Sequence, residues 1–121
     1  MKKLLLSILL LLSVASLKAQ SISYIEAKSN WYYIYDQDGK KTKALSCTVG
    51  ELQGFSSTFF ILKSGSWYYI YDATGKKTKA LSETTVGKVL SVSGDSFTSH
   101  IGSWIYTWSK EGKKISSRPA H

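Results

Sequence analysis

The residues of this chain best suited to recognition are aromatic and basic, and both kinds recur three times. Trp31, Trp67 and Trp104 each begin an aromatic run; the first two runs read WYYIYDQDGKKTKALS and WYYIYDATGKKTKALS and start 36 residues apart. Alternate residues of a strand share one face, so each run is expected to present an aromatic face. The residues on these Trp-led faces are Trp31, Tyr33, Tyr35, Trp67, Tyr69, Tyr71, Trp104, Tyr106 and Trp108. Such faces stack on sugar rings while their polar tips form hydrogen bonds.

The alternative role of the Trp-led faces is packing between sheets. Aromatic side chains bury large areas and are preferred in strands. The opposite faces carry Tyr32 and Ile34 in the first run but Ile105 and Thr107 in the third, and a threonine tolerates water. We therefore expect the Trp-led face to be the inner one, while a partly exposed binding platform stays open as the second interpretation.

Lysines follow a glycine after each aromatic run. These residues are Lys40, Lys41, Lys43, Lys76, Lys77, Lys79, Lys113 and Lys114. Three equivalent cationic clusters would attract an anionic polymer over a long range. The alternative is that lysines beside turns keep strand edges soluble. Ile34 and Ile70 stand where a phosphate-binding loop needs glycine, so a nucleoside triphosphate site is not expected.

Residues that could support catalysis are sparse. Asp95, Ser96 and His100 are the residue types of a hydrolase triad, but no nucleophile elbow surrounds Ser96. No pair of carboxylates is placed for glycosidase chemistry. The oxygen-rich segment 36–39 could suggest calcium, but its twin at 72–75 reads DATG, and a hairpin turn explains both. We expect no catalytic residue, no cofactor and no metal site.

Short alternating runs separated by turn residues predict strands throughout the chain. Examples are residues 21–27, 49–56, 58–63, 67–72, 76–82, 86–93, 97–101 and 104–108. Gly39, Gly75 and Gly112 occupy matching turns and supply the positive φ that a hairpin bulge requires. The count is three strands, then four, then four, in an antiparallel meander without room for a sizeable helix. Pro119 is expected beyond the last strand.

A strand that ends in an aromatic residue and Asp at 34–36 and 70–72, followed by a Gly-Lys turn and another strand, resembles part of a β-propeller blade of the WD-repeat type. The third unit has the strand order of a whole blade. This resemblance implies architecture only, since Ser109 replaces the Asp and no Gly-His pair is present. Three blades are fewer than a propeller uses, so it implies pairing of two chains. The alternative is a single trefoil-like or barrel-like domain.

The first nineteen residues are predicted to be a secretory signal peptide, with Lys2 and Lys3 before an apolar run and cleavage between Ala19 and Gln20. Removal of residues 1–19 leaves 102 residues and lowers the net charge from +8 to +5. Residues 20–121 are then one all-β repeat domain, with units at about 21–48, 49–85 and 86–121. Cys47, the lone cysteine, is expected to be a small, partly buried residue, and pairing with a cysteine of another chain is the alternative.

Taken together, these features predict a secreted or periplasmic, non-catalytic protein that binds a glycan or anionic polymer through the repeated aromatic and basic residues. A protein-interaction or inhibitory module and a structural component of the cell envelope are the alternatives. A homodimer and a protein partner are both considered, nucleic acid is not expected, and no segment after residue 19 is long enough to span a membrane.

Overall fold

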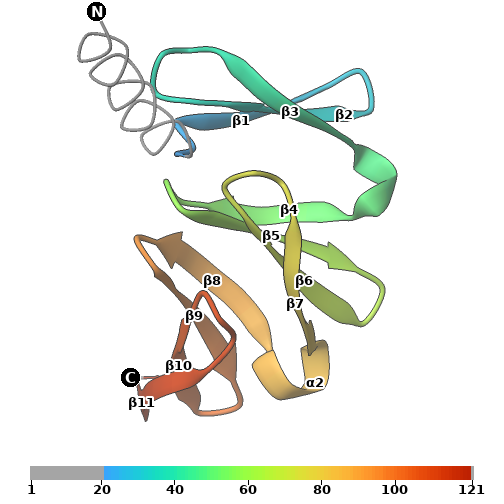
Figure 1. The fold of residues 1–121 in the computed structure, drawn as a ribbon. Coiled ribbons are helices and arrows are strands. Elements are labelled where there is room, and N and C mark those ends of the chain that lie inside the picture. The colour runs from blue at the N-terminus through green and yellow to red at the C-terminus, as the bar shows by residue number, and fades with distance from the viewer. Residues whose placement is uncertain (1–20, 121) are drawn as a thin grey trace, which may run out of the picture.

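The computed structural model describes residues 21–120, which form eleven strands in three antiparallel sheets (Figure 1). The first sheet contains β1 (Tyr24–Lys28), β2 (Trp31–Tyr35) and β3 (Lys41–Ser46). The second contains β4 (Glu51–Phe55), β5 (Phe59–Ser64), β6 (Trp67–Asp72) and β7 (Lys77–Ser82). The third contains β8 (Lys88–Ser93), β9 (Ser96–Ile101), β10 (Trp104–Ser109) and β11 (Lys114–Pro119). The expected signal peptide, residues 1–19, lies outside the described residues.

The order of strands in each sheet follows the chain, so the predicted meander of three, four and four strands is confirmed. The three sheets fan out one after another, with the second sheet between the first and the third (Figure 1). Gly39, Gly75 and Gly112 have φ of 75°, 86° and 84°, the left-handed values that favour glycine in these hairpin turns. The prediction for Pro119 was wrong, because it is the last residue of β11. It is tolerated there because β11 is an edge strand.

Successive sheets are joined by short helical turns, a 3₁₀ turn at Cys47–Val49 and α2 at Glu83–Val86. The hydroxyls of Ser46 and Ser82 each accept a hydrogen bond of 3.2 Å from the backbone N–H of the threonine two residues later. These serine caps satisfy a free N–H at the start of each turn. Strands expected from residues 49 and 86 therefore begin later, at Glu51 and Lys88.

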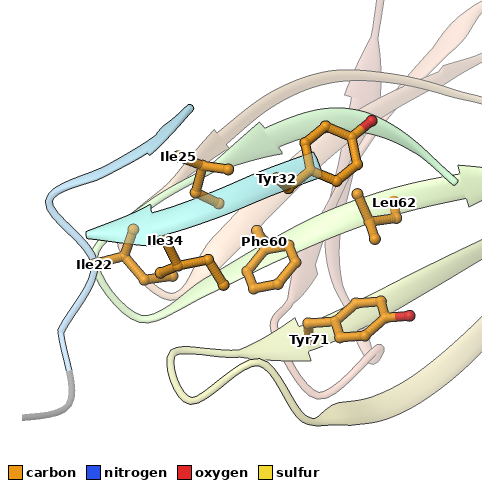
Figure 2. Packing of buried hydrophobic residues seen from close by; sticks show 7 residues of the cluster. All are labelled: Ile22, Ile25, Tyr32, Ile34, Phe60, Leu62 and Tyr71. Atoms are coloured by element: carbon orange, nitrogen blue, oxygen red, sulfur yellow. The ribbon is translucent and has the colours of Figure 1, made fainter. Parts of the chain in front are cut away.

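Two buried clusters fill the spaces between the sheets. Figure 2 shows the first, in which Tyr32 and Ile34 of β2 face Phe60 and Leu62 of β5. The second joins the other face of the second sheet, through Tyr68, Ile70 and Phe59, to Phe97 and Trp108 of the third. The second sheet is thus covered on both faces, which is why its central strand β5 reads as four consecutive buried residues.

The expectation that the Trp-led face is always the inner one was wrong. In the first sheet the opposite face is buried, because Tyr32 and Ile34 belong to the core while Trp31 is exposed and Tyr33 is half-buried. In the third sheet the Trp-led face does point inward, through Trp108. The first and third sheets each bury the face that lies against the second sheet. The position of a sheet, rather than the residue types on its faces, therefore determines which face is buried.

Cys47 is half-buried in the first connecting turn and packs against the core between the first two sheets. This agrees with its expected role as a small, partly buried residue.

Candidate binding surface

The tryptophans that begin β2, β6 and β10 lie at the same end of their sheets, next to the tight hairpins that precede these strands. Trp31, Trp67 and Trp104 are 43%, 47% and 45% exposed, so each keeps nearly half of its surface free. The glycine turns that follow β2, β6 and β10 lie at the opposite end of the same strands. The sequence places tryptophan and lysine in one repeat, but the fold separates the tryptophans from the turn lysines by the length of a strand.

A bulge brings one lysine of each unit back to the aromatic face. In the first sheet Tyr35 pairs with Lys41 and Ile34 pairs with Lys43, which leaves Thr42 as the extra residue of the bulge. Residues directly opposite each other in a sheet share a face, so Lys41 lies on the Trp-led face and Lys43 on the other. The second sheet has the same shift, with Lys77 and Lys79 at the corresponding positions. The third sheet has it with Lys114 and Ser116.

Each of these lysines lies over the central tyrosine of its aromatic run. The ammonium of Lys41 is 4.0 Å from the ring centroid of Tyr33, that of Lys77 is 4.3 Å from Tyr69, and that of Lys114 is 4.2 Å from Tyr106. The ring quadrupole attracts the cation by about 0.5–1 kcal/mol at exposed sites, which holds the ammonium over the tyrosine, two residues along the strand from the tryptophan. We call each set a Trp–Tyr–Lys trio: Trp31, Tyr33 and Lys41; Trp67, Tyr69 and Lys77; Trp104, Tyr106 and Lys114.

Two of the three remaining candidate aromatics belong to the core, while Tyr69 and Tyr106 of the trios pack against the margins of the two buried clusters. Tyr71 is stacked on Phe60 at 5.0 Å between ring centroids, Trp108 is stacked on Phe97 at 6.0 Å, and both Tyr71 and Trp108 are buried. Tyr35 is half-buried and donates a hydrogen bond of 3.1 Å to Glu26. Of the nine aromatic candidates, six therefore lie in the trios and three do not.

The other candidate lysines have separate places. Lys40, Lys76 and Lys113 sit in the turns, where their backbone N–H groups donate to Asp36, Asp72 and Ser109 at 2.9, 3.1 and 3.2 Å. Lys43 and Lys79 reach across to the next sheet, where their stems pack against the glycine of the following turn. The lysines thus do not form the single cluster per unit that the sequence suggested.

The turns that looked like calcium loops are held by their own hydrogen bonds. Asp36 Oδ1 accepts from the backbone N–H groups of Asp38 and Lys40, both at 2.9 Å. Asp72 Oδ1 accepts from the N–H and the hydroxyl of Thr74, at 2.9 and 2.6 Å. Burial raises the pKa of Asp72, but the hydrogen bonds from Thr74 and Lys76 outweigh it and leave the pKa below its ordinary value. Within residues 21–120, no group of three or more metal-binding side chains is found.

The residues of the suspected triad do not meet. Asp95 Oδ1 accepts from the hydroxyl of Thr58 at 2.8 Å and lies 3.4 Å from the ammonium of Lys110, rather than beside His100. The Thr58 hydroxyl and the Lys110 charge hold the pKa of Asp95 below its ordinary value. The hydroxyl of Ser96 donates to the carbonyl of Ser93 at 3.4 Å. These contacts connect strand ends and do not form a catalytic arrangement.

Two hollows lie away from the tryptophans. One, of about 200 Å³, lies between the second and third sheets over Phe59 and Ile70. The other, of about 540 Å³, lies beside the ion pair of Lys63 and Glu83, whose atoms are 2.7 Å apart. Neither is lined by Trp31, Trp67 or Trp104. In the described part of the chain, no helix is long and apolar enough to cross a membrane.

Two tyrosines that sequence reasoning did not single out connect the sheets. Tyr32 donates from its hydroxyl to the carbonyl of Gly50 at 2.8 Å, and Tyr68 donates to Gly87 at 2.7 Å. Each glycine stands just before the first strand of the next sheet. The signal in the sequence was the recurrence of the same Tyr and Gly in the first two units, at a spacing of 18 and 19 residues.

Comparisons with known proteins give a likeness of fold. No protein-family model matches the chain, and no curated protein matches it. Among solved structures, the chain is similar to "KlHsv2 with loop 6CD replaced by a Gly-Ser linker", with a TM-score of 0.56 and 13% sequence identity. The match covers 86% of this chain and 36% of that chain. This chain therefore spans about a third of the length of that protein, and the likeness concerns the arrangement of antiparallel sheets alone.

Proposed function

We propose that this chain is a secreted, non-catalytic protein that binds an anionic glycan through its three Trp–Tyr–Lys trios. The sheets that carry the trios are proposed to be blade-like units of a propeller type of architecture. Support for that architecture comes from the fanned meander and from the fold-level likeness to KlHsv2.

The observation that carries the proposal is the repetition of one geometry in three sheets. Each sheet has a tryptophan between 43% and 47% exposed and a lysine ammonium 4.0–4.3 Å above the neighbouring tyrosine. Core packing does not require a tryptophan to remain half-exposed, and a lysine that only kept the chain soluble would not need to lie over a ring. The third sheet has diverged at many positions, yet it retains the trio.

The chemistry of a trio suits a sugar with a negative group. The half-exposed indole can stack on the C–H face of a pyranose ring, and the ammonium over the neighbouring tyrosine can pair with a carboxylate or sulfate. Because the tyrosine already holds the lysine, less side-chain entropy is lost on binding. Each tryptophan is only about half exposed, so a single trio should bind weakly, and three trios on one polymer gain affinity through multivalency.

The test is binding of the mature chain to a sulfated glycan, a polyuronate and a neutral glycan, measured from low salt to about 0.5 M salt. We expect salt-sensitive binding to the two anionic polymers. Lys77→Gln and Trp67→Ala should each lower the affinity by about tenfold, because one of three trios is lost.

Lys79→Gln is the matched control, since it removes the same charge from the same strand but on the opposite face. Equal losses from Lys77→Gln and Lys79→Gln would mean that only net charge matters, and the trio would then not be the site. Thermal melts of every variant separate lost binding from lost folding. No binding to any of the three polymers would overturn the proposal.

A further inference from the structure

Among residues 21–120, nothing covers the outer face of the first sheet, although the same face is buried in the other two sheets. Tyr24 is 56% exposed, whereas Phe60 and Phe97, which hold the same position, are 1% and 2% exposed. The correspondence follows from the register, because these three residues pair with Tyr35, Tyr71 and Trp108 of the next strand. The turn glycines on that face differ in the same way. A Cβ added to Gly39 would have no atom within 4 Å, whereas its counterpart Gly75 is buried under the side chain of Lys43. The first sheet therefore has the surface that a preceding sheet covers elsewhere.

The outer face of the third sheet lacks the residues that hold a following sheet. In the second sheet, Tyr68 bonds to the next sheet, Lys79 packs on its turn, and Leu81 packs in the core between the two. The register places Ile105, Ser116 and Arg118 at these three positions of the third sheet. The third sheet could not hold a fourth sheet of the same kind by the same contacts.

These two differences complement each other. The tyrosines of the first two sheets donate to a glycine that precedes the first strand of the next sheet. Within residues 21–120, the first sheet has no strand equivalent to β4 of the second sheet. Its edge strand β1 corresponds to β5, so the glycine before such a strand is also missing. The third sheet lacks the donating tyrosine, because Ile105 stands in its place, and the first sheet lacks the glycine whose carbonyl would accept the hydrogen bond. The two surfaces therefore match in this respect. Neither a donor nor an acceptor is left unpaired when one packs on the other.

The outer face of the first sheet and the outer face of the third sheet also match in charge and polarity. Glu26 stands in the first sheet where the second has Leu62, and Arg118 stands in the third where the first has Leu45. Leu45 and Leu62 belong to the same core between the first two sheets. A contact of the same geometry between the third and first sheets brings Arg118 and Glu26 together. Hydroxyl-bearing residues occupy other positions of both faces: Tyr24, Tyr35, Thr98 and Thr107. Such a face is typical of chains that fold first and associate afterwards.

We propose that a second copy of this chain packs its third sheet on the outer face of the first sheet, and that the reciprocal contact closes a two-chain ring of six sheets. The contact is head to tail, because it joins two different surfaces, and such contacts give closed rings when the rotation permits. The arrangement does not depend on glycan binding. It leaves the trios open, because Trp67 and Trp104, whose sheets already have a preceding neighbour, are as exposed as Trp31.

The test is the mass of the mature chain in solution, by light scattering or sedimentation at about 1–100 µM, together with charge reversal at the proposed contact. The wild type is expected to be a dimer. Glu26→Arg or Arg118→Glu alone places like charges together twice in each ring and should weaken the dimer by about tenfold or more. Glu111→Arg, which reverses a charge in an exposed turn, should leave the dimer unchanged.

Mixing the two charge-reversed chains gives the sharpest readout. In a head-to-tail ring of one Glu26→Arg chain and one Arg118→Glu chain, both contacts join opposite charges, so the mixture should recover the dimer that is weakened in each chain alone. A wild type that stays monomeric, an open-ended polymer, or a mixture that does not recover would overturn the proposal. Thermal melts of both variants exclude unfolding as the cause of dissociation.

Discussion

The hydroxyl of Tyr68 lies 2.7 Å from the carbonyl oxygen of Gly87, and this hydrogen bond ties the second sheet to the start of the third. The first unit repeats the contact between Tyr32 and Gly50 at 2.8 Å, and there the tyrosine oxygen also accepts from the N–H of Leu52 at 3.1 Å. One residue type at one strand position thus orients each following sheet. Burial raises the pKa of Tyr32, so the neutral hydroxyl persists at ordinary pH.

We expect Tyr68→Phe to lower the free energy of unfolding by about 1–2 kcal/mol, because the carbonyl of Gly87 loses its partner in a partly buried site. For a chain of this size that is a fall in Tm of about 4–16 °C. Tyr33→Phe is the control, since its ring lies at the half-buried face under Lys41, and its effect should stay within about 0.5 kcal/mol. Equal effects in the two melts would mean that Tyr68 does not connect the sheets through its hydroxyl.

We expect Gly75→Ala to be more destabilising than Gly39→Ala. Both glycines have positive φ, so both substitutions carry a backbone cost of about 1–2 kcal/mol. Only at residue 75 would the new Cβ also lie 2.7 Å from Cγ of Lys43, a side chain of the preceding sheet. Urea unfolding of the two variants measures the difference. Lys43→Ala combined with Gly75→Ala should remove the extra cost, and a double variant no better than Gly75→Ala alone would contradict the contact.

Ser99 is the buried polar residue of the third sheet, and its hydroxyl accepts a hydrogen bond of 2.9 Å from the indole N–H of Trp108. Ser99→Ala should cost about 1–3 kcal/mol, because the indole N–H stays buried without a partner. Ser117→Ala, at an exposed position of the neighbouring strand, is the control. Thermal melts followed by tryptophan fluorescence report both changes. A Ser99→Ala melt that coincides with the wild type would show that the N–H finds another acceptor.

Much of the fold could be predicted from the repeat, because strand and turn signals are local. Alternating runs located all three sheets, and the glycines located the turns at positive φ. The ends of the helices and strands were harder to predict. Ser82 caps a helical turn, so Val86 packs in the core from α2 rather than from a strand. That outcome depends on a hydrogen bond from Thr84 that a strand pattern does not reveal.

The candidate site was predicted in its residue types but not in its grouping. The decisive feature is the bulge at Thr42, which sends Lys41 and Lys43 to opposite faces, although residues two apart in a regular strand share one. Which face of β2 is buried could not be predicted from the sequence either, because Tyr32 and Tyr33 are equally suited to burial. Only the position of the first sheet at one end of the fan decides between them.

The turn at Asp72 predicts acid sensitivity with a defined sign. Burial of its carboxyl acts to raise the pKa, but the hydrogen bonds from Thr74 and Lys76 lower it more, to below the ordinary value of 3.8. A carboxyl with a lowered folded-state pKa binds fewer protons in the folded than in the unfolded state. Its contribution to stability is therefore fully present above the ordinary value and is lost as pH falls through the folded-state pKa.

We expect Asp72→Asn to reduce stability at neutral pH, because the charge-assisted hydrogen bonds become neutral ones. As pH falls below about 3.8, the difference between wild type and variant should shrink, since the wild-type carboxyl becomes protonated. Urea unfolding at several pH values between neutral and strongly acidic measures this. Glu111→Gln removes a carboxyl from another exposed turn as a control. If Asp72→Asn lost stability in acid as steeply as the wild type, another group would have to carry the pH dependence.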